Sequence, residues 1–221
     1  MCGISDDGLA SCAHIEELYA TGNSTITTCA PFGKTLHTLH ADNTWGHDGS
    51  IISDDALRQC TGIRTLHASE NPLITTCEPF ANSLNTLYAH GKSGITDCGL
   101  KLCKNIAVLD AGNNDKITTC EPFAKFLRIL NAGNHGNVGE CGISDDGLRL
   151  CSNIEVLVAN YNPKITTCAP FAKSLYALSA YGSCGISADK LRPCKNIQKV
   201  DACYNYKIVD DEFVDDEFVD D

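Results

Sequence analysis

Hydrophobic residues recur along the chain in two alternating phrases, each opened by an isoleucine. One phrase reads like Ile143-Ser-Asp-Asp-Gly-Leu, and the other reads like Ile165-Thr-Thr-Cys-Ala-Pro-Phe. The step from the first phrase to the second is always 22 residues, the return step alternates between 26 and 21 residues, and the pattern repeats every 91 residues. A fixed period of about 20 to 50 residues is the signature of units that stack only on their neighbours. The opening isoleucines are Ile4, Ile26, Ile52, Ile74, Ile95, Ile117, Ile143, Ile165, Ile186 and, in an incomplete tenth unit, Ile208.

A second motif in each unit, I/L-x-x-L-x-A-x-x-N, predicts a short strand. In the first unit Leu18 and Ala20 flank Tyr19, and a period of two places neighbouring side chains on opposite faces of a strand. The rest of each unit predicts a helical or turn-like return. Ser5, Ser53 and Ser144 each precede two aspartates, so we expect the serine hydroxyls to cap short helices whose positive ends meet the carboxylates.

The phrase I-S/T-D-x-G-L-x-x-C-x-x-I-x-x-L resembles the cysteine-containing class of leucine-rich repeats found in the repeat domains of F-box proteins. The resemblance implies an α/β repeat solenoid, an arc with short parallel strands on the concave face and short helices or turns on the convex face. It covers residues 1–208 as about nine units of 21–26 residues, with a 91-residue super-repeat. Residues 209–221 are expected to form a separate acidic C-terminal tail.

The charge distribution argues against nucleic acid as a ligand. The formal net charge is −11, and eight acidic residues lie in 210–221, which leaves about −3 for the repeats. Phosphate binding needs a concentrated basic face, and the sequence has no basic run. The chain also has no apolar stretch near 18 residues and no secretory signal. We therefore expect a cytoplasmic protein without membrane contact.

Fourteen cysteines raise the question of disulfides or zinc. Nine of them recur at two fixed places in the units, and no C-x-x-C pair occurs, so we expect them to be reduced thiols that pack in the core. Those nine are Cys12, Cys29, Cys60, Cys77, Cys103, Cys120, Cys151, Cys168 and Cys194. The irregular five are expected to be more accessible, although three of them share a Cys-Gly-Ile phrase that allows burial. They are Cys2, Cys98, Cys141, Cys184 and Cys203.

The outward-facing strand positions are the variable positions of the repeat and the candidate binding residues. In the first four units they carry aromatic, histidine and acidic side chains, and aromatic residues on an exposed sheet are common anchors of protein interfaces. The predicted partner-binding patch consists of Tyr19, His40, Asp42, His67, Tyr88 and His90. Trp45, the single tryptophan, lies in a longer glycine-rich return and is a further contact candidate.

A metal site at His40, Asp42 and His67 is not expected, because parallel side chains on neighbouring strands should point the same way instead of converging. No catalytic motif occurs, so neither a catalytic residue nor a cofactor is predicted. The favoured function is a non-enzymatic scaffold that binds a partner protein on its concave face. The alternatives are a ubiquitin-ligase substrate receptor without the F-box, an enzyme inhibitor, and a self-assembling structural protein whose ends associate.

Overall fold

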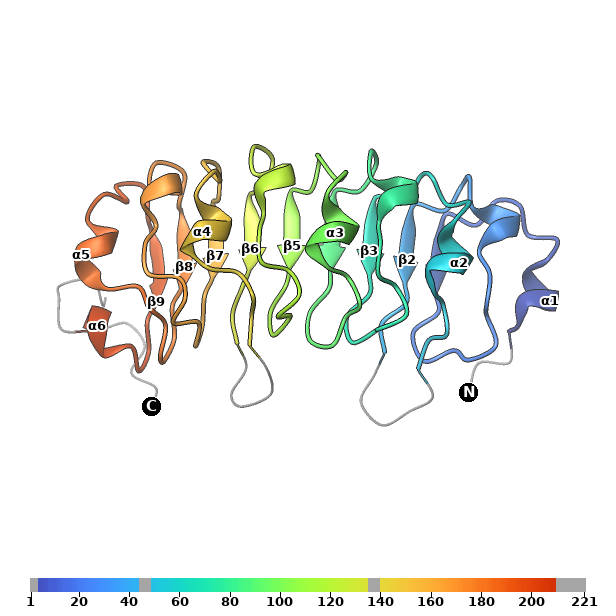
Figure 1. Ribbon diagram of the computed structural model, residues 1–221, viewed down its shortest axis with the longest axis horizontal. Helices are drawn as coiled ribbons and strands as arrows, with labels where there is room; N and C mark the ends of the chain where they lie inside the picture. The colour runs from blue at the N-terminus through green and yellow to red at the C-terminus, as the bar shows by residue number, and fades with distance from the viewer. Residues whose placement is uncertain (1–3, 44–48, 135–139, 210–221) are drawn as a thin grey trace.

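The computed structural model describes residues 4–43, 49–134 and 140–209. Nine three-residue strands form one parallel sheet in sequence order, β1 to β9 (Figure 1). The central residue of each strand is a leucine or valine that faces the core, and these residues are paired in register along the sheet, as Leu39 is with Leu66. The strands are β1 (Glu17–Tyr19), β2 (Thr38–His40), β3 (Thr65–His67), β4 (Thr86–Tyr88), β5 (Val108–Asp110), β6 (Ile129–Asn131), β7 (Val156–Val158), β8 (Ala177–Ser179) and β9 (Lys199–Asp201).

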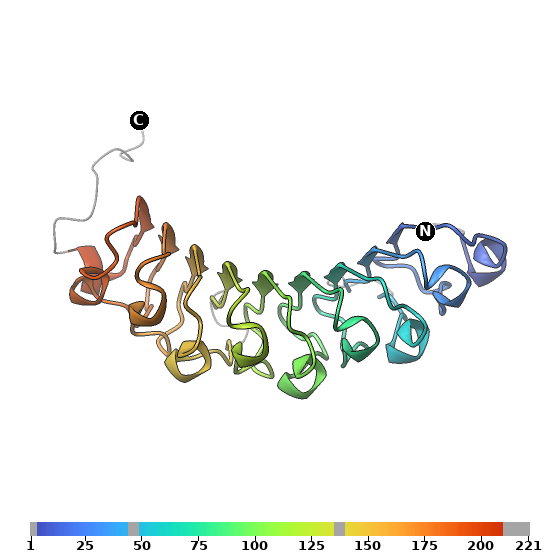
Figure 2. The same ribbon diagram turned by 90° about the horizontal axis from the view of Figure 1, so that it is seen from above.

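Short helices return the chain on the opposite side. α-Helical turns and 3-10 turns alternate up to α5, following the two sequence phrases, and a last α-helical turn follows β9. They are α1 (Asp6–Leu9), η1 (Ala30–Phe32), α2 (Asp54–Leu57), η2 (Glu78–Phe80), α3 (Asp97–Leu100), η3 (Glu121–Phe123), α4 (Asp145–Leu148), η4 (Ala169–Phe171), α5 (Ala188–Leu191) and α6 (Tyr206–Val209). Figure 2 shows the strands on the inner side of a shallow arc and the helical turns on the outer side. The predicted leucine-rich-repeat arc is therefore confirmed.

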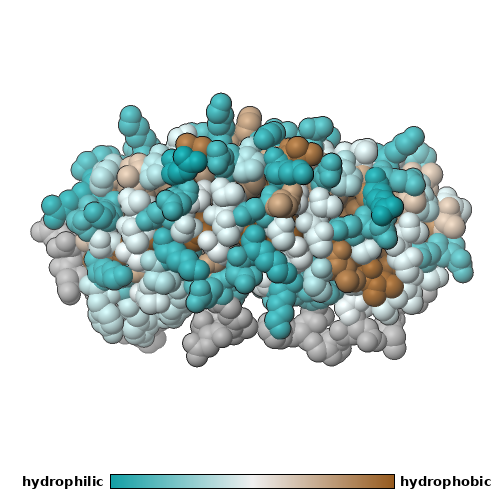
Figure 3. Space-filling model, viewed as in Figure 1, coloured by the Kyte–Doolittle hydropathy of each residue, from teal (hydrophilic) through white to brown (hydrophobic). Residues whose placement is uncertain are grey.

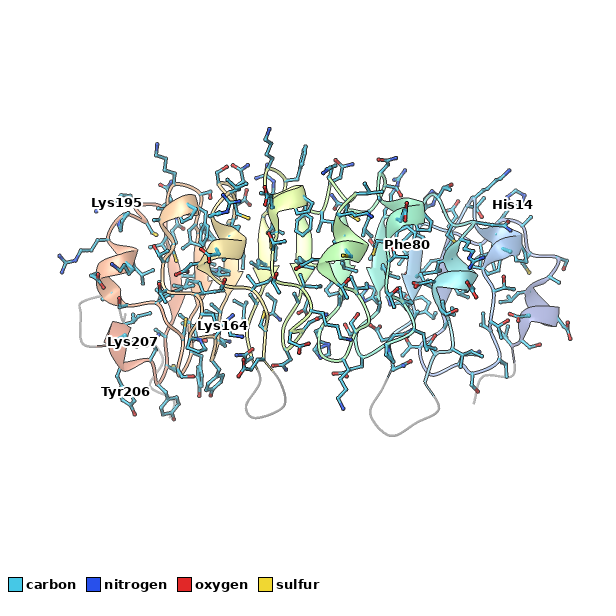
Figure 4. All side chains as sticks on the ribbon, in the orientation of Figure 1. His14, Phe80, Lys164, Lys195, Tyr206 and Lys207 are labelled. Atoms are coloured by element: carbon cyan, nitrogen blue, oxygen red, sulfur yellow. The ribbon has the colours of Figure 1, made fainter. Side chains whose placement is uncertain are left out.

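The core consists of columns of equivalent side chains that run the length of the arc. The phenylalanines of the 3-10 turns are at most 1% exposed, and Figure 4 labels one of them, Phe80. The helical face that Figure 3 displays is mostly hydrophilic or neutral, with separate hydrophobic areas, the largest of them at the lower right of the view, toward the N-terminal end. No helix in the described ranges is long and apolar enough to cross a membrane.

Eight of the nine recurring cysteines are buried, and Cys12 in the first unit is half-buried. The thiols of neighbouring units influence one another: the Cys60 thiol together with burial raises the pKa of Cys29, and the Cys103 thiol together with burial raises that of Cys77. This confirms that the recurring cysteines are core residues. Of the three irregular cysteines in Cys-Gly-Ile phrases, Cys141 and Cys184 are buried and Cys2 lies outside the described residues, whereas Cys98 and Cys203 are exposed.

The expected serine caps are wrong. None of Ser5, Ser53 and Ser144 makes a capping hydrogen bond through its side chain, whereas Thr96 at the equivalent position accepts one from Gly99. The aspartate that follows each of these residues begins the helix, and its carboxylate accepts hydrogen bonds from the next unit.

In α2, for example, Asp54 Oδ1 accepts hydrogen bonds from the backbone N–H groups of Thr75 and Thr76 at 2.8 and 3.3 Å, and Oδ2 accepts one from the Thr75 hydroxyl at 2.5 Å. Asp6, Asp97 and Asp145 make the same contacts in their units. The acidic residues of the helical face therefore hold consecutive units together.

Buried asparagines link the units from the other end of each strand. Asn71 donates from Nδ2 to the carbonyls of Ala41 and Ile52 at 2.8 and 3.2 Å, and its Oδ1 accepts from Leu73 N–H. Each bond satisfies a backbone group that would otherwise be buried without a partner. The asparagine of the repeat motif thus closes the turn that follows the strand.

Candidate functional site

Four aromatic rings form a continuous stack across the N-terminal half of the concave face. Tyr19, His40, His67 and Tyr88 are the last residues of β1 to β4 and lie directly opposite one another in the strand register. The successive ring centroids are 4.1, 4.0 and 4.3 Å apart, and the successive planes differ by 10°, 20° and 16°. Parallel strands about 4.8 Å apart impose this spacing when each presents a flat side chain at the same position. We call these four residues the ring stack.

Carboxylates border the ring stack at its N-terminal end. Glu17 lies on β1 with its Oε1 3.5 Å from His40 Nε2. A hydrogen bond with the Glu17 side chain raises the pKa of Tyr19. Burial and the neighbouring His40 lower the pKa of His67, against the opposing effect of Asp42 and Glu17. These shifts favour the neutral form of the interior histidine of the stack.

Asp42 follows β2 and lies beside the two histidines. Its Oδ1 accepts a hydrogen bond from Ser69 N–H at 2.8 Å, which holds the carboxylate across the gap between β2 and β3. One ligand atom from each of His40, Asp42 and His67 lies within 4.8 Å of the others, and all three residues are half-buried. The rings of His40 and His67 stack nearly parallel, as expected for neighbouring strands, and the Asp42 carboxylate brings a third ligand atom close to them.

His90 occupies the position after β4 that is equivalent to Asp42, one strand beyond His67. Its Nε2 lies 4.0 Å from Glu70 Oε1, so it forms a separate contact at the edge of the ring stack. The next strand continues the ring column with Asp110, whose Oδ1 accepts a hydrogen bond from Gly112 N–H at 3.0 Å. At β5 the column therefore changes from aromatic rings to Asp110, whose carboxylate accepts a hydrogen bond within the turn that follows the strand.

The structure reveals a second aromatic cluster that the sequence pattern did not identify. Tyr161, Tyr181 and Tyr204 follow β7, β8 and β9, with centroid distances of 5.3 Å and 5.4 Å along the series and tilted ring planes. Tyr161 and Tyr204 have φ angles of 54° and 58°, which tyrosine rarely adopts. The available signal was a tyrosine one or two residues after the strand alanine in three successive units: Tyr161 and Tyr204 follow it by two residues and Tyr181 by one.

Trp45 and the tail residues 210–221 lie outside the described residues. Val209, the first residue assigned to the tail, ends α6. The predicted contact at Trp45 and the separate acidic tail therefore stay predictions.

No protein-family model and no curated protein sequence matches the chain. Among solved structures, it is similar to the functional domain of InlJ from Listeria monocytogenes, which is described as including a cysteine ladder. The TM-score is 0.51 at 16% identity, and the likeness covers 90% of this chain and 46% of that chain. A likeness at this identity shows the fold, that of a leucine-rich-repeat solenoid, and such solenoids generally offer an extended concave surface for binding.

Proposed function

We propose that this chain is a non-enzymatic scaffold that binds a partner protein on the N-terminal half of its concave face. The observation that carries the proposal is the ring stack, in which four side chains are held at centroid distances of 4.0–4.3 Å. Ordering flexible side chains on binding costs about 0.5–1.5 kcal/mol each. Rings that are already ordered by their neighbours avoid most of that cost, and tyrosine is enriched among the residues that dominate interface energy.

The residues beside the ring stack indicate the chemistry of the partner. Glu17, Asp42 and Glu70 place carboxylates beside the rings, and the chain as a whole has a formal net charge of −11. A complementary partner surface presents arginine, lysine or amide donors around an apolar or aromatic centre. The donors of such a partner would bind the carboxylates, and its apolar side chains would pack against the edges of the rings.

The test is affinity capture with the native chain and with the triple variant His40→Ala/His67→Ala/Tyr88→Ala. The matched control is Phe126→Ala/Leu150→Ala, which removes two exposed apolar side chains, 52% and 47% exposed, next to η3 and α4 on the helical face. We expect the control to retain the captured partner and the triple variant to lose it. With the purified partner, the Kd should rise by about tenfold or more, as for a typical hot-spot truncation.

Circular dichroism and the unfolding midpoint of each variant separate lost binding from lost folding. Equal capture by the native chain and the folded triple variant would refute the proposal and direct attention to the tyrosine cluster and to Trp45. The identity of the partner then decides among an adaptor, a ubiquitin-ligase substrate receptor and an enzyme inhibitor. Capture of further copies of the chain itself would favour end-to-end assembly.

A further inference from the structure

We propose that His40, Asp42 and His67 form a binding site for a divalent transition-metal ion of the zinc type on the concave face. The proposal goes beyond partner binding, since it concerns the isolated chain. It rests on the proximity of three ligand-bearing side chains, from β2, the turn after β2 and β3, with their ligand atoms within 4.8 Å of one another.

The distances are close to those of an assembled site. Two ligands that each lie about 2.1 Å from a tetrahedral zinc ion are roughly 3.4 Å apart. The three ligand atoms therefore need to approach by about 1 Å or slightly more, which rotation about the side-chain bonds can supply while the strands stay in register. The rings of His40 and His67 now stack at 4.0 Å with an interplanar angle of 20°. Because a metal ion lies near the plane of each ligating imidazole, binding must tilt these rings out of the stack.

The surroundings already position two of the ligands. Ser69 N–H donates to Asp42 Oδ1 at 2.8 Å and so orients the carboxylate. Glu17 Oε1 lies 3.5 Å from His40 Nε2. Contacts between a carboxylate and a histidine ring fix the orientation of many metal-bound histidines, and their loss typically costs about 10–100-fold in metal affinity.

The ligand set selects the class of ion. Two imidazole nitrogens and one carboxylate oxygen suit Zn²⁺, Co²⁺, Ni²⁺ or Cu²⁺, whereas Mg²⁺ and Ca²⁺ prefer oxygen ligands. Three protein ligands leave at least one coordination position on the solvent side. A water molecule, or a side chain of a bound partner, would fill that position.

Isothermal titration of the reduced full-length chain with Zn²⁺ tests the proposal, with Co²⁺ as a spectroscopic probe. We expect one saturable site that EDTA reverses. Asp42→Asn and His67→Gln should each weaken binding by about tenfold or more. The matched control His14→Gln removes an exposed histidine at the far upper edge of the first unit and should bind as the native chain does (Figure 4).

The cysteines are the competing ligands, and Co²⁺ distinguishes them. A thiolate-to-cobalt charge-transfer band in the near ultraviolet would show cysteine ligation and overturn the proposal. The same conclusion would follow from an absence of saturable binding, or from Asp42→Asn and His67→Gln variants that bind like the native chain. In the supporting outcome, Zn²⁺ also shifts the ring resonances of His40 and His67 in the NMR spectrum and leaves those of His14 in place. Partner capture in the presence of EDTA measures partner binding without a bound metal ion, so failure of this proposal can be distinguished from failure of the proposed function.

Discussion

At the scale of single residues, the position two after the strand alanine is the most constrained point of the repeat. The chain adopts a left-handed conformation there in seven described units, at Gly22, Glu70, Gly91, Asn113, Tyr161, Gly182 and Tyr204. Glycine occupies this region freely, whereas other L-residues pay about 1–2 kcal/mol. Tyrosines at two of these positions retain a strained backbone in order to place their rings in the tyrosine cluster.

Gly182→Ala should destabilise the C-terminal half of the arc. The φ angle of Gly182 is +60°, and a Cβ there would lie 2.3 Å from Cε1 of Tyr161. Gly22→Ala is the matched control, because Gly22 has a φ of +67° and an added Cβ would meet nothing within 4 Å. We expect the free energy of unfolding to fall by about 1–2 kcal/mol in the control, from the backbone conformation alone, and by more in Gly182→Ala. Urea unfolding measures both, and equal losses would show that the Tyr161 ring moves aside without resistance.

At the scale of elements, the two aspartates that open α2 have different roles although they are neighbours in the sequence. Asp54 accepts three hydrogen bonds from the next unit, whereas Asp55 makes an exposed ion pair with Arg58 at 2.6 Å. The equivalent contact of Asp6 in α1 also changes the pKa of the Asp6 carboxyl group. Burial acts to raise the pKa of Asp6, but hydrogen bonds from Thr27 and Thr28 outweigh it and lower that pKa. The first aspartate of each pair is therefore a connector between units.

Asp54→Ala and Asp55→Ala should separate these roles within one helix. Loss of the Asp54 carboxylate leaves the Thr75 and Thr76 donors without their acceptor, and we expect the free energy of unfolding to fall by about 1–3 kcal/mol. Loss of Asp55 removes a surface ion pair and should change stability by less than about 1 kcal/mol. Urea unfolding followed by circular dichroism gives both values. Similar effects of the two substitutions would contradict the connecting role of Asp54.

At the scale of the whole molecule, stability should vary along the arc, because each unit of a solenoid contacts only its neighbours. The first unit has a neighbour on one side in the described structure, and its core is more open. Ile4 is 49% exposed and Leu18 is 8% exposed, whereas Ile95 is fully buried. Because cysteines occur in units along the whole arc, their reactivity can measure how stability varies from the first unit to the middle.

Thiol labelling under native conditions should follow burial along the chain. Cys98 is exposed and should react first with iodoacetamide, ahead of the exposed Cys203, since a hydrogen bond to Asp201 raises the pKa of Cys203. Burial raises the pKa of Cys141 to about 11, and hydrogen bonding to Cys103 together with burial raises that of Cys77. Only thiolates react, so these two should stay unlabelled until local unfolding exposes them.

Mass spectrometry of the labelled peptides gives the rate at each cysteine. In moderate urea, Cys12 in the first unit should become reactive before Cys77 and Cys120 in the middle of the arc. Simultaneous labelling of all three would show that the arc unfolds as one cooperative unit.

The sequence by itself determined the architecture. The spacing of the isoleucines set the number and length of the units, the Leu-x-Ala alternation marked the strands, and recurrence identified the core cysteines. These features depend on local propensity and on a period that every unit shares. Tyr19, His40, His67 and Tyr88 could be assigned to one column for the same reason, because strand alternation decides which side chains face outward.

Only the tertiary structure decided which side chains of neighbouring units come into contact. The Asp54 carboxylate was expected to meet the positive end of its own helix, yet its hydrogen-bond partners lie 21 and 22 residues further along the chain. The position of Asp42 beside His40 and His67 depends on the turn after β2 and on the hydrogen bond from Ser69. The tyrosine cluster depends on left-handed turns after β7 and β9. A one-dimensional period specifies which positions are equivalent, whereas strand register and turn conformation set the distances between side chains in neighbouring units.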